Sequence, residues 1–127
     1  MSVSVEQLMS EARLTVPEIS PQETQQRLDK DEIDVLLDVR ETSEWNNGHI
    51  AQALHTPRGL LEWHADPNHP SHQQQLASQT AARIVVLCAS GGRSLLAAKT
   101  LQEMGYTDVC SMHGGMTAWK ESGLPIQ

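Results

Sequence analysis

The sequence predicts an α/β protein with a mostly parallel sheet and helices on both faces. Apolar runs typical of buried strands alternate with segments of helical periodicity, and parallel strands need such helical crossovers between them. One of these strands leads directly into a glycine-containing turn and then into a helix, which is the arrangement that forms anion sites in many α/β proteins. We therefore expect the chemistry of the chain at that turn.

Two helices are predicted before the first long strand. The first lies within residues 1–14, where Ser4 and Gln7 have the spacing of a capping box ahead of apolar residues at helical intervals. The second begins after the capping pair Ser20-Pro21 and continues to about Leu28.

The rest of the chain alternates between the two kinds of element. Runs of apolar residues predict strands, and glycines or prolines mark the ends of the helical segments. We expect strands at 33–39, 53–54, 84–87 and 108–112, and helices at 42–45, 95–104 and 116–121. The stretch 57–75 is polar, and its part 63–72 carries the Pro and Asn residues typical of a surface loop.

Length and charge limit the classes of function. The 127 residues fit one domain, 1–127, and we expect a monomer or weak dimer. A net charge of −7 argues against nucleic acid or an anionic membrane as a partner, because both need a basic surface. The chain shows neither a secretory leader nor an apolar run long enough to cross a bilayer, and its two cysteines form no disulfide framework. A cytoplasmic location is expected.

The segment from Cys88 to Ser94 is the main candidate for a site. It follows the apolar run at 84–87 and leads into a helical segment, so several backbone N–H groups and the positive end of a helix dipole should point at one place. Such surroundings favour the thiolate form of a cysteine, which is its nucleophilic form. We expect the thiol of Cys88 to be exposed and surrounded by main-chain amides.

The chain resembles the rhodanese, or thiosulfate sulfurtransferase, domain family in its single-domain form, over most of its length. Three ordered blocks carry the resemblance: Leu37-Asp38-Val39-Arg40 with Glu44, Gly48-His49-Ile50, Ala53 and Pro57; Cys88 through Ser94; and Gly105-Tyr106 with Val109 and the run from Gly114 to Trp119. A cysteine followed by glycine and arginine is a weak signal alone, whereas three blocks at appropriate separations are specific.

The resemblance implies a five-stranded sheet and an enzyme whose cysteine carries sulfur as a persulfide. Cys88 would attack the outer sulfur of a small anion such as thiosulfate, and cyanide or a thiol would then accept that sulfur. The anion-binding loop would consist of Ala89, Ser90, Gly91, Gly92, Arg93 and Ser94. Arg93 would add positive charge or brace the loop, and no cofactor or metal is implied.

Loop length separates this chemistry from two related ones. Four residues lie between Cys88 and Arg93, whereas the related dual-specificity phosphatases and arsenate reductases have one more. The shorter loop favours sulfur transfer over phosphate or arsenate chemistry. Two further alternatives remain: a persulfide carrier that exchanges sulfur with protein partners, and a noncatalytic interaction module, against which the intact loop argues.

The remaining candidates are weighed against ordinary structural roles. Structural support is the favoured role for four residues of the first block: Asp38, Arg40, Glu44 and His49. Arg58 is a candidate substrate contact, with a plain surface arginine as the alternative. Cys110 lies in an apolar strand pattern, which favours a buried inert thiol over a resolving partner. The histidines of 64–72 lack the spacing of metal ligands.

Overall fold

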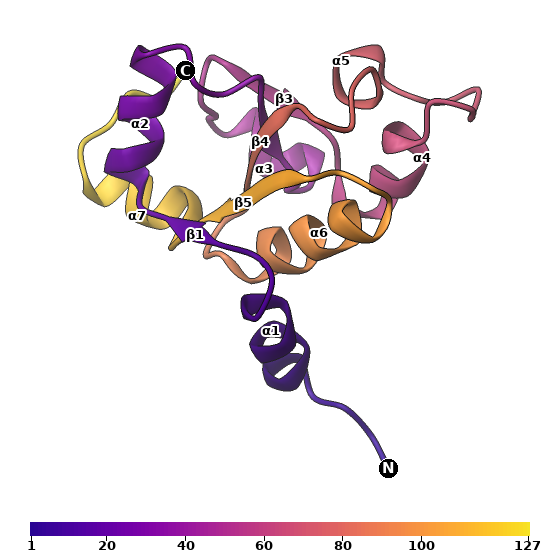
Figure 1. Ribbon diagram of the computed structural model, residues 1–127. Coiled ribbons are helices and arrows are strands. Elements are labelled where there is room, and N and C mark those ends of the chain that lie inside the picture. The colour runs from indigo at the N-terminus through magenta and orange to yellow at the C-terminus, as the bar shows by residue number, and fades with distance from the viewer.

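A five-stranded sheet forms the centre of the protein. The computed structural model describes all residues, 1–127. The strand order is β1-β5-β4-β2-β3, and every neighbouring pair is parallel (Figure 1). The strands are β1 (Glu18–Ile19), β2 (Val35–Asp38), β3 (Ala53–His55), β4 (Arg83–Leu87) and β5 (Asp108–Met112). The prediction of an α/β fold is confirmed, and the sheet expected to be mostly parallel is parallel throughout.

Seven α-helices and one short 3₁₀ helix accompany the sheet. The α-helices are α1 (Val5–Arg13), α2 (Pro21–Asp29), α3 (Thr42–Asn46), α4 (Leu61–Ala65), α5 (Gln74–Ala77), α6 (Gly92–Glu103) and α7 (Gly115–Glu121), and the 3₁₀ helix η1 spans Arg58–Leu60. In Figure 1, α6 lies along one side of the sheet, and α2 and α7 lie together on the other. Helices therefore cover both faces, as predicted.

The two faces of the sheet have separate hydrophobic cores. Side chains of a strand alternate between faces, so Val86 joins the larger core and Val85 the smaller one. The larger core receives residues from α1, α4 and α6, and the smaller one receives Met116 and Trp119 from α7. Burial on both faces explains why β2 and β4 read as continuous apolar runs in the sequence.

The capping contacts predicted at the starts of the first two helices are present. Ser4 and Gln7 form the expected capping box of α1, and the Ser20 side chain accepts a hydrogen bond from the Glu23 amide at the start of α2. Helix α1 lies beside α6, and Ala12 packs into the larger core. Figure 1 shows α1 below the rest of the molecule, with the N-terminus extending away from it.

Two features differ from the sequence prediction. Residues 63–72 were expected as a surface loop, and 66–72 contain no helix or strand, but 63–65 belong to α4. The wider polar stretch 57–75 also contains η1 and the start of α5, because Leu61 and Leu76 are buried in the larger core. Strand β1 was not predicted at all. It has two residues, and only its pairing with β5 makes it a strand.

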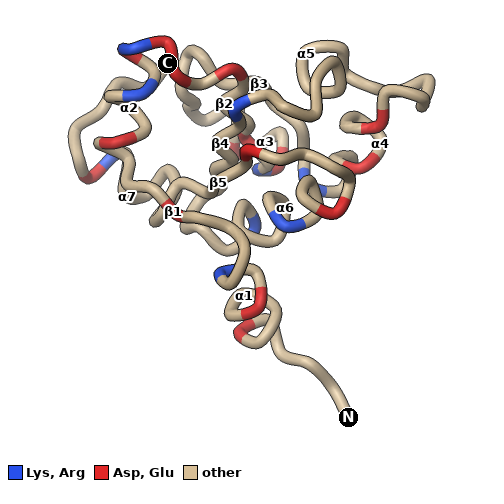
Figure 2. The backbone as a smooth tube through the Cα atoms, in the orientation of Figure 1, with Lys and Arg blue, Asp and Glu red and all other residues tan.

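Charged residues lie on the helices and loops and at the ends of strands (Figure 2). Arg83 and Asp108 begin β4 and β5, whereas Asp38 ends β2. None of the helices combines the length and the apolar composition that crossing a bilayer would require.

Candidate active site

The loop that carries Cys88 lies at the carboxyl edge of the sheet. Strand β4 ends at Leu87, and α6 begins at Gly92, so the predicted strand-turn-helix arrangement is present. Gly91 caps the helix with a φ of 109°, a conformation that residues with a side chain rarely adopt. The carboxyl edge of a parallel sheet is the usual position of ligand sites in α/β folds.

The thiol of Cys88 is buried, which corrects the expectation of an exposed one. The residue is 1% exposed and belongs to the larger core. The reason is the alternation of β4, which continues past the end of the strand and points Cys88 to the same face as Ile84 and Val86, under α6. Burial does not leave the sulfur without polar contacts, because the Gly91 N–H donates to Sγ at 3.1 Å.

Two serine hydroxyl groups extend the polar surroundings of the sulfur. The Cys88 thiol donates to Oγ of Ser94 at 3.4 Å, and that hydroxyl donates to the Gly91 carbonyl at 3.1 Å. Oγ of Ser94 also lies 2.8 Å from Oγ of Ser111 on β5. Sequence reasoning missed Ser111, because no local signal marks a residue that reaches the loop across the sheet.

The first amides of α6 are unused. The backbone N–H groups of Gly92, Arg93 and Ser94 have no acceptor within the protein, and no side chain caps this end of the helix. Unsatisfied amides at a helix N-terminus carry partial positive charge and suit an anion. The predicted loop thus offers unpaired donors immediately after the residue that bonds to the sulfur.

Helix α7 fixes the start of the loop from the other side. The N–H groups of Met116 and Thr117 donate to the carbonyls of Cys88 and Ala89, at 2.8 and 3.0 Å. Gly115 comes so close that a Cβ there would lie 2.4 Å from the Cys88 oxygen. Gly115 of the third sequence block therefore has a packing reason, since only glycine permits this approach.

Arg93 braces the loop. Its two terminal nitrogens donate to the two carboxylate oxygens of Glu44 on α3, at 2.8 and 3.0 Å. These hydrogen bonds lower the pKa of Glu44 to about 2, so the carboxylate is ionised at neutral pH. Of the two roles expected for Arg93, the bracing contact is the one that the geometry provides.

Asp38 and Arg40 form a buried ion pair beside the loop. The Asp38 carboxylate is fully buried and receives the Arg40 guanidinium at 2.8 to 3.1 Å. Arg40 also donates to the carbonyls of Glu44 and Gly48. His49 stacks on Trp45 with ring centroids 3.6 Å apart. These contacts tie α3 to the end of β2 and agree with structural support.

Arg58 is placed away from the loop. Its guanidinium donates to Glu62 and to Thr100, each at 3.1 Å. Thr100 lies eight residues beyond Gly92 on α6, which is about 12 Å along the helix axis. The structure therefore does not bring Arg58 to the Cys88 loop.

The histidines of 64–72 hydrogen-bond to separate partners. Nδ1 of His64 lies 3.2 Å from Oγ1 of Thr56, and Nδ1 of His72 lies 2.7 Å from the His69 carbonyl. No group of three or more His, Cys, Asp or Glu side chains converges as a metal site would require. These hydrogen bonds hold the segment together and attach it to Thr56.

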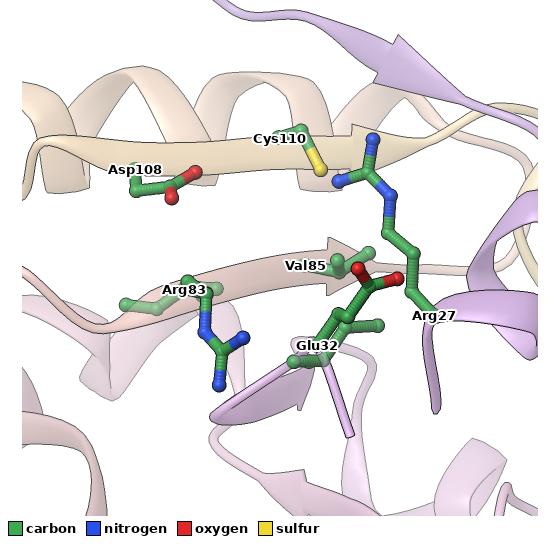
Figure 3. Close-up of a pocket in the computed structure, with 8 residues that line it drawn as sticks. Arg27, Glu32, Arg83, Val85, Asp108 and Cys110 are labelled. Carbon is green, nitrogen blue, oxygen red and sulfur yellow. The ribbon is translucent and has the colours of Figure 1, made fainter. Parts of the chain in front are cut away.

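The second cysteine lies in a cavity near the opposite edge of the sheet. This cavity, of about 290 Å³, is lined by residues of α2, β4, β5 and the segment before β2, and Figure 3 shows the Cys110 sulfur facing the Arg27 guanidinium. Burial raises the pKa of the Cys110 thiol to about 11. Cys110 pairs with Val85 in the sheet, so its Cα lies about 11 Å from that of Cys88, beyond the reach of a disulfide.

Comparison with known proteins identifies the family. The model of the rhodanese-like domain matches residues 20–122. The chain belongs to the rhodanese-like family. Helix α1 precedes the matched region, so it is an addition to the part that the family model describes.

Relatives of this rhodanese-like chain include a sulfurtransferase and a protein named as a sulfur carrier. It is 33% identical over 111 residues to a sulfurtransferase of Allochromatium vinosum. That match covers 87% of this chain and 94% of the sulfurtransferase. The chain is 34% identical over 110 residues to YrkF of Bacillus subtilis, named as a candidate sulfur carrier protein; the match covers 87% of this chain but only 54% of that protein. This chain therefore spans about half of YrkF.

A solved structure matches the whole chain. A protein of unknown function from Rhodopseudomonas palustris, described as a possible tyrosine phosphatase, has a TM-score of 0.92 and 29% identity. The match covers 100% of this chain and 96% of the other. It therefore includes α1, which lies outside the family model.

Proposed function

We propose that the protein is a sulfurtransferase that moves sulfane sulfur through a persulfide on Cys88. The observation that carries the proposal is the pairing of one thiol with the donors of its own loop. The Gly91 amide bonds to the sulfur, and the unpaired amides of Gly92 and Arg93 begin the adjoining helix. A persulfide places a second sulfur about 2 Å beyond the first. Those amides suit its negative charge.

The proposed reaction has two steps. The Cys88 thiolate attacks the outer sulfur of thiosulfate; a new S–S bond forms, the bond to the sulfonate sulfur breaks, and sulfite leaves with the electron pair. The terminal sulfur of the persulfide then bonds to cyanide or to a thiolate, and the Cys88 thiolate is regenerated as the leaving group. Charge and atoms balance in both steps without a redox cofactor.

A persulfide carrier is the second candidate. The resemblance to YrkF supports this role. A carrier and an enzyme would share the Cys88 persulfide and differ in the donor and acceptor. In either role we expect a cytoplasmic protein, because the cytoplasm keeps free thiols such as Cys88 and Cys110 reduced.

The geometry supports phosphatase chemistry less well. Arginine binds phosphate through paired N–H donors, but both terminal nitrogens of Arg93 are bonded to Glu44. It also needs an acid to protonate the leaving group. Glu44 cannot supply that proton near neutral pH, because its pKa is about 2.

Intact mass after brief thiosulfate treatment tests the proposal. We expect a gain of about 32 mass units, the mass of one sulfur, which cyanide removes and which Cys88→Ser does not show. A second assay separates the enzyme from the carrier by comparing two sulfur donors, thiosulfate and a protein persulfide. Efficient turnover of thiosulfate indicates the enzyme, and sulfur uptake from the protein persulfide alone indicates the carrier. Absence of a sulfur adduct with every sulfane donor, together with hydrolysis of an aryl phosphate that depends on Cys88, would overturn the proposal in favour of a phosphatase.

A further inference from the structure

Ser94 and Ser111 form a closed pair of hydroxyl groups next to the reacting sulfur. Both residues are fully buried, so neither hydroxyl can satisfy its hydrogen bonds with bulk water. Oγ of Ser111 has a single polar contact, which is Oγ of Ser94 at 2.8 Å. Ser94 has three contacts: Ser111, the Gly91 carbonyl and the sulfur of Cys88.

Counting acceptors gives the direction of each bond. The hydroxyl proton of Ser111 has no acceptor other than Oγ of Ser94, so Ser111 donates and Ser94 accepts. The hydroxyl proton of Ser94 then remains free for a different acceptor. With Cys88 as a thiol, that acceptor is the Gly91 carbonyl, at 3.1 Å, while the thiol donates to Oγ of Ser94.

When Cys88 loses its thiol proton, the hydrogen bonds around its sulfur must change. An ionised sulfur no longer donates, and it needs donors from its neighbours. The Ser94 hydroxyl can rotate toward the sulfur, because the Gly91 carbonyl keeps a second donor in the Leu95 amide at 3.2 Å. The bond from Ser111 is retained in both states, and a donated bond strengthens the bond that the accepting hydroxyl makes in turn.

We propose that Ser111 is a positioning residue for sulfur transfer: its hydroxyl holds Ser94 as a hydrogen-bond donor to the anionic sulfur of Cys88. This inference rests on the proposed function, in which Cys88 is the reacting group. Ser111 contacts neither substrate nor sulfur and acts through Ser94 alone. Its position on β5, paired with Val86 of β4, makes the sheet itself part of the site.

Alkylation of Cys88 by iodoacetamide tests the inference without requiring sulfur transfer. We expect Ser111→Ala to slow the modification of Cys88 about threefold to tenfold, since the thiolate loses support from its donor. The ultraviolet absorbance of the thiolate should fall in parallel. Ser111→Thr keeps the hydroxyl and should restore the rate to within about twofold of the wild type.

Three comparisons separate this effect from a loss of structure. Thr24→Val deletes another fully buried hydroxyl, which bonds within α2, and should leave the alkylation rate unchanged. If Ser111→Ala does not fold, Ser111→Thr and Ser111→Val compare the presence and absence of the hydroxyl at nearly equal volume. In a Ser94→Ala background, Ser111→Ala should have no further effect on the rate.

The outcomes distinguish the two proposals. A folded Ser111→Ala variant with a wild-type alkylation rate would overturn the role of Ser111, even if the wild type accepts sulfur from thiosulfate. A slower Ser111→Ala variant with a rescued Ser111→Thr variant would support that role, even if no sulfur donor reacts with Cys88.

Discussion

Cys88 follows β4 at the carboxyl edge of the sheet, whereas Cys110 lies on the neighbouring strand β5 and lines a cavity at the amino edge; both are buried. Cys88 is 1% exposed and Cys110 is 7% exposed. Cys88 has the Gly91 amide and the Ser94 hydroxyl within hydrogen-bonding distance of its sulfur. Cys110 has no hydrogen bond, and burial raises the pKa of its thiol to about 11. The two buried thiols therefore differ in the hydrogen-bond donors around them, and we expect this difference to set their reactivity apart.

The two edges also differ in what holds them together. At the carboxyl edge, α3, α6 and α7 meet the ends of β2 and β4 through buried or partly buried polar contacts. At the amino edge, Asp34 pairs with Arg83 at the surface, where water competes for both charges. The fold thus concentrates its fixed polar contacts around Cys88.

Removing each thiol in turn gives the largest expected difference. Cys88→Ser should lower sulfur transfer by more than about a thousandfold, because no persulfide can form. Cys110→Ser should retain most of the activity, since that thiol lies on the other face of the sheet. The measurement is turnover with thiosulfate and cyanide, or with a protein persulfide donor. Equal losses in the two variants would contradict the comparison.

Alkylation should separate the two thiols in the wild-type protein. With a pKa of about 11, roughly one Cys110 in a thousand is ionised at pH 8. Cys88 has the Gly91 amide and the Ser94 hydroxyl beside its sulfur, so iodoacetamide should modify it faster than Cys110. The rates follow from mass spectrometry of quenched samples over time. Faster modification of Cys110 would show that its cavity is more open than the structure indicates.

Adding one methyl group tests how tightly α7 holds the loop. Gly115→Ala should destabilise the protein by about 2–4 kcal/mol, because the new Cβ would overlap the Cys88 carbonyl and the φ of 55° is unfavourable for alanine. Gly123→Ala is the matched control. Its φ is also positive, at 72°, but nothing lies within 4 Å, so about 1 kcal/mol is expected. Urea denaturation of both variants measures the difference, and equal losses would argue against the close approach.

The ion pair between Glu44 and Arg93 should give the smallest effect. The pKa of Glu44 is lowered from 4.5 to about 2, so the pair contributes stability above pH 4.5 that is lost as the pH falls through about 2. We expect about 1 kcal/mol, far less than the full shift implies, because the side chains are 33% and 41% exposed. Glu44→Gln should remove this part of the acid sensitivity.

The surface pair at the amino edge is the control for that prediction. The Asp34 pKa is also lowered to about 2, through hydrogen bonds with Arg83. Asp34→Asn should leave sulfur transfer unchanged, whereas Glu44→Gln should lower it several-fold by releasing the brace on Arg93. If the two variants have equal activity, the brace does not matter for function.

Local signals in the sequence predicted the elements and the place of the loop. The capping box at Ser4 and the glycine turn after β4 depend on residues close in sequence, and both are present in the structure. The exposure of Cys88 was predicted wrongly, because it depends on which face the strand alternation selects at its last residue. Ser111 and β1 could not be predicted, since each acquires its role only through contact with distant parts of the chain.

The most direct test of the account is to locate the transferred sulfur. Trypsin separates the two thiols, because Arg83 and Arg93 bracket Cys88, whereas Lys99 and Lys120 bracket Cys110. After treatment with thiosulfate and alkylation to trap the persulfide, the additional mass of about 32 units should appear on the Cys88 peptide alone. The same mass on the Cys110 peptide, or on both peptides equally, would contradict the claim that the donors around Cys88 set it apart.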